Sequence, residues 1–312
     1  MTERPEMFEG VEEIWMDGEF VDWEDAQVHV LTHGLHYGTG VFEGVRCYDT
    51  VDGPALFRWE EHLQRLYDSG KPYDIEIPFE PEELTDATVE LIQRQDLNSC
   101  YIRPIAFYGY EELGLNPSNC PVNVAIAVWP WGAYLGEEAL EEGVDVAVST
   151  WRKYASSQIP TNAKTTGPYV NSVLASLEAK SNGYVEAILL NKEGNVAEGP
   201  GENLFLVRDG EIFTSGLAES NLDGITRQTV ITLARDLGYT VHDQATISRG
   251  ELYTADELFF SGTAAEVTPI RSVDDNQIGE GTKGPVTDEI QQEFFDLVEG
   301  KLDQYDDWFT YL

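Results

Sequence analysis

Two short turns flanked by apolar segments restrict the fold of this chain more than any other feature. Asp17-Gly18 lies between the apolar runs 14–16 and 19–21, and Asp209-Gly210 follows the strand-like run 203–208. Asp-Gly between apolar runs favours a tight turn that joins two neighbouring antiparallel strands. A chain with such antiparallel hairpins cannot be built from parallel strands and crossover helices alone.

Amphipathic helices alternate with strand-like segments in both halves of the chain. Apolar residues recur at helical spacing in some segments, whereas others are rich in aromatic and β-branched residues and are bounded by turn formers. The pattern predicts an α/β fold with mixed sheets, of the α+β kind, and not a doubly wound parallel sheet. The predicted helices cover 60–69, 81–96, 168–182, 225–237 and 286–300, and the predicted strands cover 101–108, 122–129, 144–149, 185–190, 203–208, 211–214 and 258–261.

An interruption near the middle of the chain marks a domain boundary. Pro130-Trp131-Gly132 breaks the strand pattern, and the residues after it are acidic and polar. The length of 312 residues is itself enough for two domains. We therefore predict an N-terminal α/β domain over 1–129, an interdomain loop over 130–142 and a C-terminal domain over 143–312.

The charge of the chain is strongly acidic. It has 57 Asp and Glu against 19 Lys and Arg, which gives a formal net charge of -38, and only seven of the basic residues are lysines. The acidic residues are spread along the whole sequence and do not form one tail. Dispersed carboxylates of this kind are typical of halophilic proteins. The same field repels phosphate backbones, which argues against a nucleic-acid partner.

The compartment is predicted from the cysteines and from the absence of targeting segments. Cys47, Cys100 and Cys120 have no spacing typical of a disulfide framework, which fits a reducing compartment. The N-terminus lacks the apolar core of a signal peptide, and no stretch approaches the ~20 apolar residues of a membrane span. We therefore predict a cytoplasmic protein with no membrane partner.

Several common site motifs are missing. There is no Walker-type phosphate loop, no dinucleotide fingerprint and no Gly-x-Ser-x-Gly elbow. His29, His33 and His36 lie close together in sequence, but no cysteine or paired carboxylate motif completes a metal site. We predict that these histidines form hydrogen bonds and that the chain binds no metal.

Four segments combine small, polar and turn-forming residues, as ligand sites do. Together they offer a lysine, a carboxylate, a helix start that attracts anions and a turn rich in hydroxyl groups. Each segment alone also fits an ordinary surface lysine, a glycine-rich turn, a helix cap or close packing. The segments are 161–169 with Lys164, 196–205 with Glu198 and Glu202, 222–227, and 261–266.

Six motifs then give the chain a specific likeness. They are Val41-Phe42-Glu43-Gly44-Val45-Arg46, Tyr101-Ile102-Arg103-Pro104, Trp129-Pro130-Trp131-Gly132-Ala133-Tyr134-Leu135-Gly136, Glu198-Gly199-Pro200-Gly201-Glu202-Asn203-Leu204-Phe205, Gly224-Ile225-Thr226-Arg227 and Ser261-Gly262-Thr263-Ala264-Ala265-Glu266. With them the chain resembles the branched-chain-amino-acid aminotransferases, which are class IV, or fold type IV, pyridoxal-phosphate enzymes. The likeness runs from about residue 12 to about residue 300, in the family's order and spacing.

The resemblance implies an architecture and a reaction. It implies a smaller N-terminal α/β domain, a larger C-terminal domain with a pseudo-barrel sheet, and pyridoxal 5'-phosphate bound between them. It implies a reversible exchange of amino groups between L-leucine, L-isoleucine or L-valine and 2-oxoglutarate, with glutamate and 2-oxo acids as the other partners. It also implies a homo-oligomer, at least a dimer, with a hexamer as the larger form.

The resemblance assigns cofactor contacts residue by residue. Lys164 matches the catalytic lysine that binds the cofactor's aldehyde as a Schiff base and later acts as general base. Glu198 matches the partner of the ring nitrogen, with Glu202 as its rival in the same glycine-rich stretch, and Tyr169 matches the partner of the phenolic oxygen. The position that packs on the ring face is Leu222, and those near the phosphate are Arg65, Gly224, Ile225, Thr226 and Thr263.

Substrate contacts are assigned in the same way. Leu115 matches a residue that the partner subunit contributes. Tyr101 and Arg103 match a polar pair, and Arg103 is expected to meet the distal carboxylate of glutamate. Ala264 and Ala265 match the turn that binds the α-carboxylate. The apolar pocket positions are Tyr37, Phe42, Gly44, Trp131, Tyr134 and Tyr169.

Two alternatives stay open at this stage. Within class IV, a D-amino-acid aminotransferase or an aminodeoxychorismate lyase shares many motifs, and a non-catalytic relative would have the same composition. The residues Thr165, Thr166 and Pro168 depart from relatives that have smaller residues after the lysine, which affects the expected mobility of this loop and leaves the role of Lys164 unchanged.

The acidic composition generates a test. If the carboxylates are an adaptation to salt, activity and resistance to thermal unfolding should both rise as KCl is added, because salt screens the mutual repulsion of surface charges. Melting temperature and turnover measured across a KCl series check this. Full activity and stability without salt would contradict the prediction.

Overall fold

The computed structural model describes residues 5–132 and 134–312, so Ala133 of the predicted interdomain loop lies outside the described residues. The chain forms two compact units. The first unit includes the segment that carries Lys164 and the C-terminal end, although both follow the interruption near residue 130. It comprises Met1–Trp131, Ala163–Gly167 and Val298–Leu312, and the second unit comprises Gly132–Asn162 and Pro168–Leu297.

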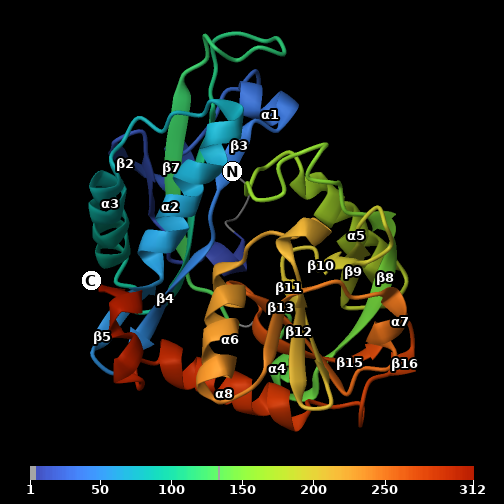
Figure 1. The fold of residues 1–312 in the computed structure, drawn as a ribbon. Helices are drawn as coiled ribbons and strands as arrows, with labels where there is room; N and C mark the ends of the chain where they lie inside the picture. The colour runs from blue at the N-terminus through green and yellow to red at the C-terminus, as the bar shows by residue number, and fades with distance from the viewer. Residues whose placement is uncertain (1–4, 133) are drawn as a thin grey trace. The chain divides into compact units, whose positions relative to one another are not determined.

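An eight-stranded antiparallel sheet is the centre of the first unit (Figure 1). Its strand order is β17-β5-β4-β6-β7-β1-β2, and β3 pairs with β6 beyond the end of β4. The strands are β1 (Glu13–Met16), β2 (Glu19–Asp22), β3 (Gly40–Phe42), β4 (Val45–Thr50), β5 (Gly53–Phe57), β6 (Cys100–Tyr108), β7 (Val122–Trp129) and β17 (Phe309–Tyr311).

The predicted hairpin between β1 and β2 is confirmed. Asp17 and Gly18 both have positive φ, 50° and 98°, as the twist of a two-residue hairpin requires. The Asp17 carboxylate also accepts hydrogen bonds from the Val124 N–H and from the Asn123 side chain, each at 2.7 Å. The turn is therefore fastened to the neighbouring strand β7.

Two amphipathic helices cover the apolar side of this sheet. α3 begins with Pro81 at its first turn and a capping box of Glu80 and Glu83, and it packs on β1 and β7. α2 packs on β3 and buries Trp59 and Leu66. The helices are α1 (His33–Tyr37), α2 (Trp59–Gly70) and α3 (Pro81–Arg94), with 3₁₀ helices η1 (Glu6–Phe8), η2 (Trp23–Asp25), η3 (Lys71–Tyr73) and η5 (Asp303–Trp308).

The second unit contains a nine-stranded mixed sheet, which confirms the predicted fold class. β8 pairs in parallel with β9 and β15, and β12 pairs in parallel with β13, whereas the other pairs are antiparallel. The Phe205 and Phe259 rings stack at 4.9 Å in its core. The strands are β8 (Val144–Arg152), β9 (Glu186–Leu190), β10 (Val196–Glu198), β11 (Asn203–Arg208), β12 (Glu211–Ser215), β13 (Val241–Ala245), β14 (Glu257–Gly262), β15 (Glu266–Val273) and β16 (Asn276–Gln277).

Helices of the second unit pack on this sheet. α5 packs on β8 and β9, and α6 packs on β13 and β14. Gly238, with φ 94°, follows the end of α6, as predicted. The helices are α4 (Glu137–Glu142), α5 (Tyr169–Ser181), α6 (Ile225–Asp236), α7 (Arg249–Leu252), α8 (Pro285–Val298) and the 3₁₀ helix η4 (Leu217–Glu219).

The stretch 130–142, predicted as a loop, contains α4. Glycines flank this helix, its glutamates are good helix formers, and the helix, with its buried Ala139, packs on β15. In the part of the chain that the structure describes, no helix has the length and apolarity needed to cross a bilayer. Nor does a group of three His, Cys, Asp or Glu side chains arranged for a metal occur there.

Candidate active site

The segment that carries Lys164 is bound to the first unit through its backbone. The Lys164 carbonyl accepts a hydrogen bond from the Phe42 N–H at 3.1 Å, and the Lys164 N–H donates to Ser69 Oγ at 2.9 Å. Val41 and Thr165 form an antiparallel bridge beside them. These bonds fix the main chain on both sides of the lysine while its amine extends toward the Phe42 ring, 4.9 Å from the ring centre.

Two glycines allow this pairing. Gly38 has φ 64°, and a Cβ there would lie 2.4 Å from the Cα of Gly167. The Thr166 hydroxyl donates to the Gly38 carbonyl at 2.8 Å. Thr166, which departs from the family pattern, therefore attaches the lysine loop to the sheet.

Arg103 lies against the same Phe42 ring as Lys164. Its guanidinium carbon is 4.9 Å from the centre of that ring and 5.4 Å from the centre of the Tyr101 ring. Its Nη2 donates to the Tyr101 hydroxyl at 3.4 Å. Within residues 5–132 and 134–312, its buried Nε has no hydrogen-bond partner. A buried donor of this kind normally meets an acceptor, so the position suits a carboxylate ligand.

Aromatic rings continue the wall beside Arg103. The Tyr101 ring centre is 5.2 Å from that of Trp131 and 5.1 Å from that of Trp129. A Cβ at Gly44 would lie 1.9 Å from the Tyr101 hydroxyl oxygen. Gly44 is therefore needed for the position of Tyr101, and the first unit brings together Phe42, Gly44, Tyr101, Arg103 and Lys164.

Glu198 ends β10 in the second unit and is almost fully buried. Its Oε2 accepts a hydrogen bond from the Leu222 N–H at 2.7 Å, and its Oε1 lies 2.5 Å from Nζ of Lys153. The rival Glu202 accepts a hydrogen bond from the adjacent Gly201 N–H at 3.0 Å. The contacts with Leu222 and Lys153 hold Glu198 as an oriented carboxylate, which suits a cationic ring nitrogen.

The start of α6 suits a phosphate group. Gly224 is its N-cap and has no side chain with which to cap the first turn, which begins with Ile225 and Thr226. Uncapped N–H groups at a helix start attract anions. A Cβ at Gly224 would lie 2.0 Å from Asn203 Oδ1, so glycine is needed there, and the Asn203 amide donates to the Leu222 carbonyl at 2.9 Å.

A second group of donors lies at the turn after β14. Thr263, Ala264 and Ala265 form the tight connection to β15. The Ser261 hydroxyl, which precedes it, is buried and has no hydrogen-bond partner among the residues whose placement is described. An unpaired buried hydroxyl and an uncapped helix are both features that a phosphate oxygen would complete, so the residues fit the expected cofactor.

The remaining predicted residues are Tyr169, Tyr37, Tyr134 and Leu115, and Tyr169 is among the groups that act electrostatically on Lys153 beside Glu198. Tyr169 begins α5 in the second unit. Tyr37 and Tyr134 are 44% and 43% exposed, and Leu115, in the connection between β6 and β7, is 89% exposed. So little of Leu115 touches its own chain that its predicted role requires another subunit.

Three residues of the candidate site were missed by the sequence analysis. Glu43 and His62 are buried beside Arg65, and Lys153 is buried beside Glu198. Glu43 belongs to the motif 41–46, but no role was predicted for its carboxylate. The scarcity of lysines was the only available signal for Lys153.

The histidines near the N-terminus make hydrogen bonds. The His33 ring contacts Thr39 Oγ1 and the Gly114 carbonyl, both at 2.7 Å. His36 Nε2 contacts the Val30 carbonyl at 2.8 Å.

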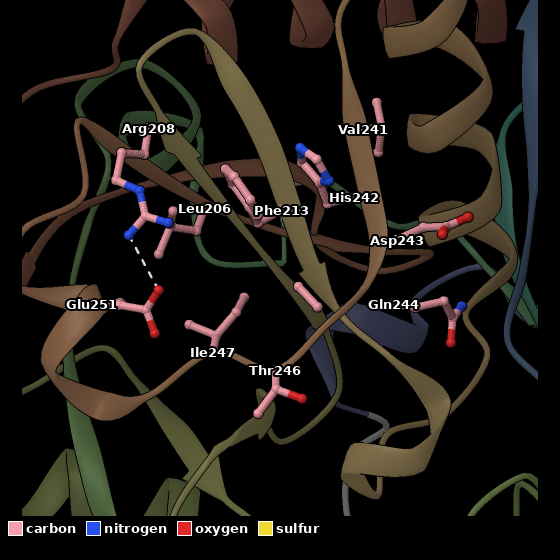
Figure 2. Close-up of a pocket in the computed structure, with 11 residues that line it drawn as sticks. Leu206, Arg208, Phe213, Val241, His242, Asp243, Gln244, Thr246, Ile247 and Glu251 are labelled. Carbon is pink, nitrogen blue, oxygen red and sulfur yellow. Dashed lines mark hydrogen bonds and ion pairs between the residues drawn. The ribbon is translucent and has the colours of Figure 1, made fainter.

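A separate hollow of about 530 Å³ lies along β11, β12 and β13. Figure 2 shows Arg208 pairing with Glu251 at its rim and the stacked rings of Phe213 and His242 inside it. None of the predicted site residues lines this hollow. We therefore place no step of the reaction there.

Lys153 generates a pH-dependent stability prediction. Burial lowers the pKa of Lys153, but attraction to Glu198 outweighs it and raises the pKa above the ordinary value of 10.5. The pair therefore stabilises the fold fully below about pH 10.5, and this contribution is lost as the pH rises through the native pKa. Lys153→Met should cost ~3–5 kcal/mol of unfolding free energy at pH 7, because Glu198 is left buried and unpaired.

Urea unfolding between pH 7 and pH 11 measures this effect. Lys153→Arg is the matched control and should retain most of the stability. Combining Lys153→Met with Glu198→Gln should recover much of the loss. A Lys153→Met protein as stable as the wild type at pH 7 would refute the assignment.

Comparison with known proteins agrees with this geometry. Residues 40–273 match the family model described as amino-transferase class IV. The branched-chain-amino-acid aminotransferase of Escherichia coli (strain K12) is 51% identical over 296 residues, which cover 95% of this chain and 96% of that protein.

Solved structures give the same result. The crystal structure of the Escherichia coli branched-chain amino acid aminotransferase has a TM-score of 0.94 at 51% identity and covers 96% of this chain and 98% of its own. The branched-chain amino acid aminotransferase from Thermobaculum terrenum, solved in its PLP-form (holo-form), has a TM-score of 0.89 at 34% identity and covers 96% of this chain and 97% of its own. The chain therefore belongs to the branched-chain-amino-acid aminotransferases, which are pyridoxal-phosphate-dependent class IV enzymes.

Proposed function

We propose that this chain catalyses the reversible transfer of the amino group between L-leucine, L-isoleucine or L-valine and 2-oxoglutarate. Family membership supports the reaction class. The observation that carries the substrate pair is the shared Phe42 ring, which has the amine of Lys164 and the guanidinium of Arg103 at the same distance of 4.9 Å. Lys164, which can carry a proton, and Arg103, which can donate hydrogen bonds to a carboxylate, therefore lie beside the same apolar ring.

The cofactor, when bound, supplies the electron sink that makes the Cα proton of an amino acid acidic. Lys164 would hold the cofactor through its amine, and when that amine is free its Nζ would remove the proton from Cα of the substrate. Glu198, held by Lys153 and by the Leu222 N–H, is oriented to pair with the protonated ring nitrogen.

The other cofactor contacts follow from the chemistry of each group. Tyr169 donates its hydroxyl proton to the phenolic oxygen, and Leu222 packs on the ring face. The phosphate is bound by charge and by backbone donors, a combination favoured at an uncapped helix start. We assign it to Arg65, Gly224, Ile225, Thr226 and Thr263.

Dual specificity follows from the mixed character of the substrate surface. An apolar substrate side chain packs against Phe42, Trp131 and Tyr134, and burying it is worth ~1.5–3 kcal/mol. Glutamate places its distal carboxylate on Arg103 and Tyr101. The α-carboxylate is bound at the Ala264-Ala265 turn in both cases. Tyr37 and Gly44 complete the apolar pocket.

We further propose that the active enzyme is a homo-oligomer, at least a dimer, in a salt-adapted cytoplasm. Leu35 is 63% exposed and Leu115 is 89% exposed, and large apolar side chains exposed to this extent on one unit are typical of a subunit interface. Leu115 is then the residue supplied to the pocket of the partner.

The covalent role of Lys164 gives a direct test. Lys164→Ala should abolish turnover and the visible absorption band of the holoenzyme, because the amine of Lys153, the other lysine described in the candidate site, is held in an ion pair with Glu198. Lys192→Ala, at an exposed lysine, is the control. Borohydride reduction followed by peptide mass spectrometry should label Lys164 in the wild type. Wild-type turnover in Lys164→Ala, or a label on a different lysine, would overturn the mechanism.

The role of Arg103 predicts a selective loss. Arg103→Ala should raise the KM for 2-oxoglutarate by roughly 10–100-fold, since a hydrogen bond to a charged group is worth ~1.5–3 kcal/mol. The KM for 2-oxoisocaproate should change little. Arg94→Ala is the matched control, because that guanidinium also lies on an aromatic ring, Phe20, at 4.0 Å, but on the surface. Equal losses for both oxo acids would exclude this role.

A further inference from the structure

A fully buried carboxylate lies beside Arg65 in the first unit. Glu43 has no exposed surface. Its Oε1 accepts a hydrogen bond from Arg65 Nε at 2.6 Å, and its Oε2 accepts from Arg65 Nη2 at 2.8 Å. His62 Nδ1 contacts the same Oε2 at 2.7 Å. The two parallel bonds fix the plane of the guanidinium, and His62 fixes the carboxylate that holds it.

The charges of this cluster balance. Burial alone would raise the pKa of Glu43, but Arg65 and His62 outweigh it and hold the pKa well below its ordinary range. The pKa of His62 lies below its ordinary value, because burial, together with the nearby charges of Arg65 and Lys164, outweighs the opposing effect of Glu43. At neutral pH the cluster therefore consists of one anion, one cation and a neutral imidazole. Burial of Glu43 is tolerated only because of this pairing.

Hydrogen bonds connect the cluster to Lys164. Phe42, the residue before Glu43, donates to the Lys164 carbonyl, and Ser69, one helical turn after Arg65 on α2, accepts from the Lys164 N–H. The helix that carries Arg65, the strand end that carries Glu43 and the lysine segment are thus joined.

We propose that Glu43 is a positioning residue that holds the Arg65 guanidinium in the orientation in which it binds the phosphate group of the cofactor. The inference rests on the proposed phosphate role of Arg65. Arg side chains have many rotamers, and a side chain fixed before binding loses less conformational freedom when the ligand arrives. The two buried hydrogen bonds to Glu43 fix the Arg65 side chain before the cofactor binds. His62 acts through Glu43 in the same way.

The test compares two ligands that differ only in the phosphate. The stripped full-length enzyme is titrated with pyridoxal 5'-phosphate and with pyridoxal. Glu43→Gln should weaken pyridoxal 5'-phosphate by roughly 10–100-fold, the range found when a hydrogen-bonded support behind a binding group is removed. Its affinity for pyridoxal should stay within about twofold, since pyridoxal makes no phosphate contact.

A matched control exists in the second unit. Asp145 forms a fork of the same kind with Arg271, at 3.0 and 2.8 Å but more exposed, and neither residue is a predicted site residue. Asp145→Asn should leave both affinities unchanged. A purely structural role for Glu43 would instead reduce the two affinities equally, and that outcome, or no change in either, overturns the proposal.

Two further measurements keep the outcome decisive. If Glu43→Gln does not fold, Arg65→Lys keeps the charge but cannot form the fork, and it should show the same selective loss for the phosphorylated ligand. Loss of neither affinity, or of both equally, in Arg65→Lys would again count against the inference. Borohydride labelling of Lys164 in the wild type distinguishes failure of the proposed function from failure of this inference. If Lys164 is not labelled, the proposed function fails. If Lys164 is labelled but Glu43→Gln leaves the ratio of the pyridoxal 5'-phosphate and pyridoxal affinities unchanged, only the role of Glu43 is refuted.

Discussion

The position of Lys164 is fixed by the hydrogen bonds of its own backbone. Its N–H and carbonyl are bound by Ser69 on α2 and by Phe42 on β3, so the main chain is fixed where the amine must react. The Gly38–Gly167 contact, where a Cβ on Gly38 would collide with the Gly167 backbone, allows the two segments to approach. A lysine held this way can exchange its covalent partner without loosening the fold. In the proposed mechanism both half-reactions use this arrangement, because the Phe42 ring contacted by the amine is also the ring contacted by Arg103.

The candidate site uses charge differently from the acidic surface of the molecule. The chain as a whole carries a formal net charge of -38, yet Glu43 and Glu198 are each buried against a cation. A buried pair is costly to break, because removing one member strands the other in a medium that solvates it poorly. Such pairs add little to stability compared with apolar packing of the same volume. What these pairs provide is orientation, since each carboxylate is held in one position relative to the group beside it.

Local sequence chemistry predicted the elements well and the supporting residues poorly. Asp17-Gly18 and Gly238 act through their own backbone angles, so their turns and ends could be predicted from adjacent residues. The candidate residues Lys164 and Glu198 were reached through their small neighbours and through the family likeness. Lys153 and His62 could not be found in this way. Each contributes only through a partner distant in sequence, Glu198 in one case and Glu43 in the other, and that proximity arises from the folded sheet.

The acidic surface and the anionic ligands pose one physical conflict. Under the proposed function, phosphate and dicarboxylates approach a protein whose long-range field repels them, and Arg65 and Arg103 are the groups proposed to attract them at contact. The two effects differ in range. At 1 M salt the screening length is ~3 Å, so repulsion between exposed charges disappears while partly buried contacts, with an effective dielectric constant near ~20, are largely retained. High salt therefore favours both the compact fold and the encounter with substrate. A chain of this charge can keep an anion-binding site because the groups that bind the anion are shielded from the solvent that screens the rest.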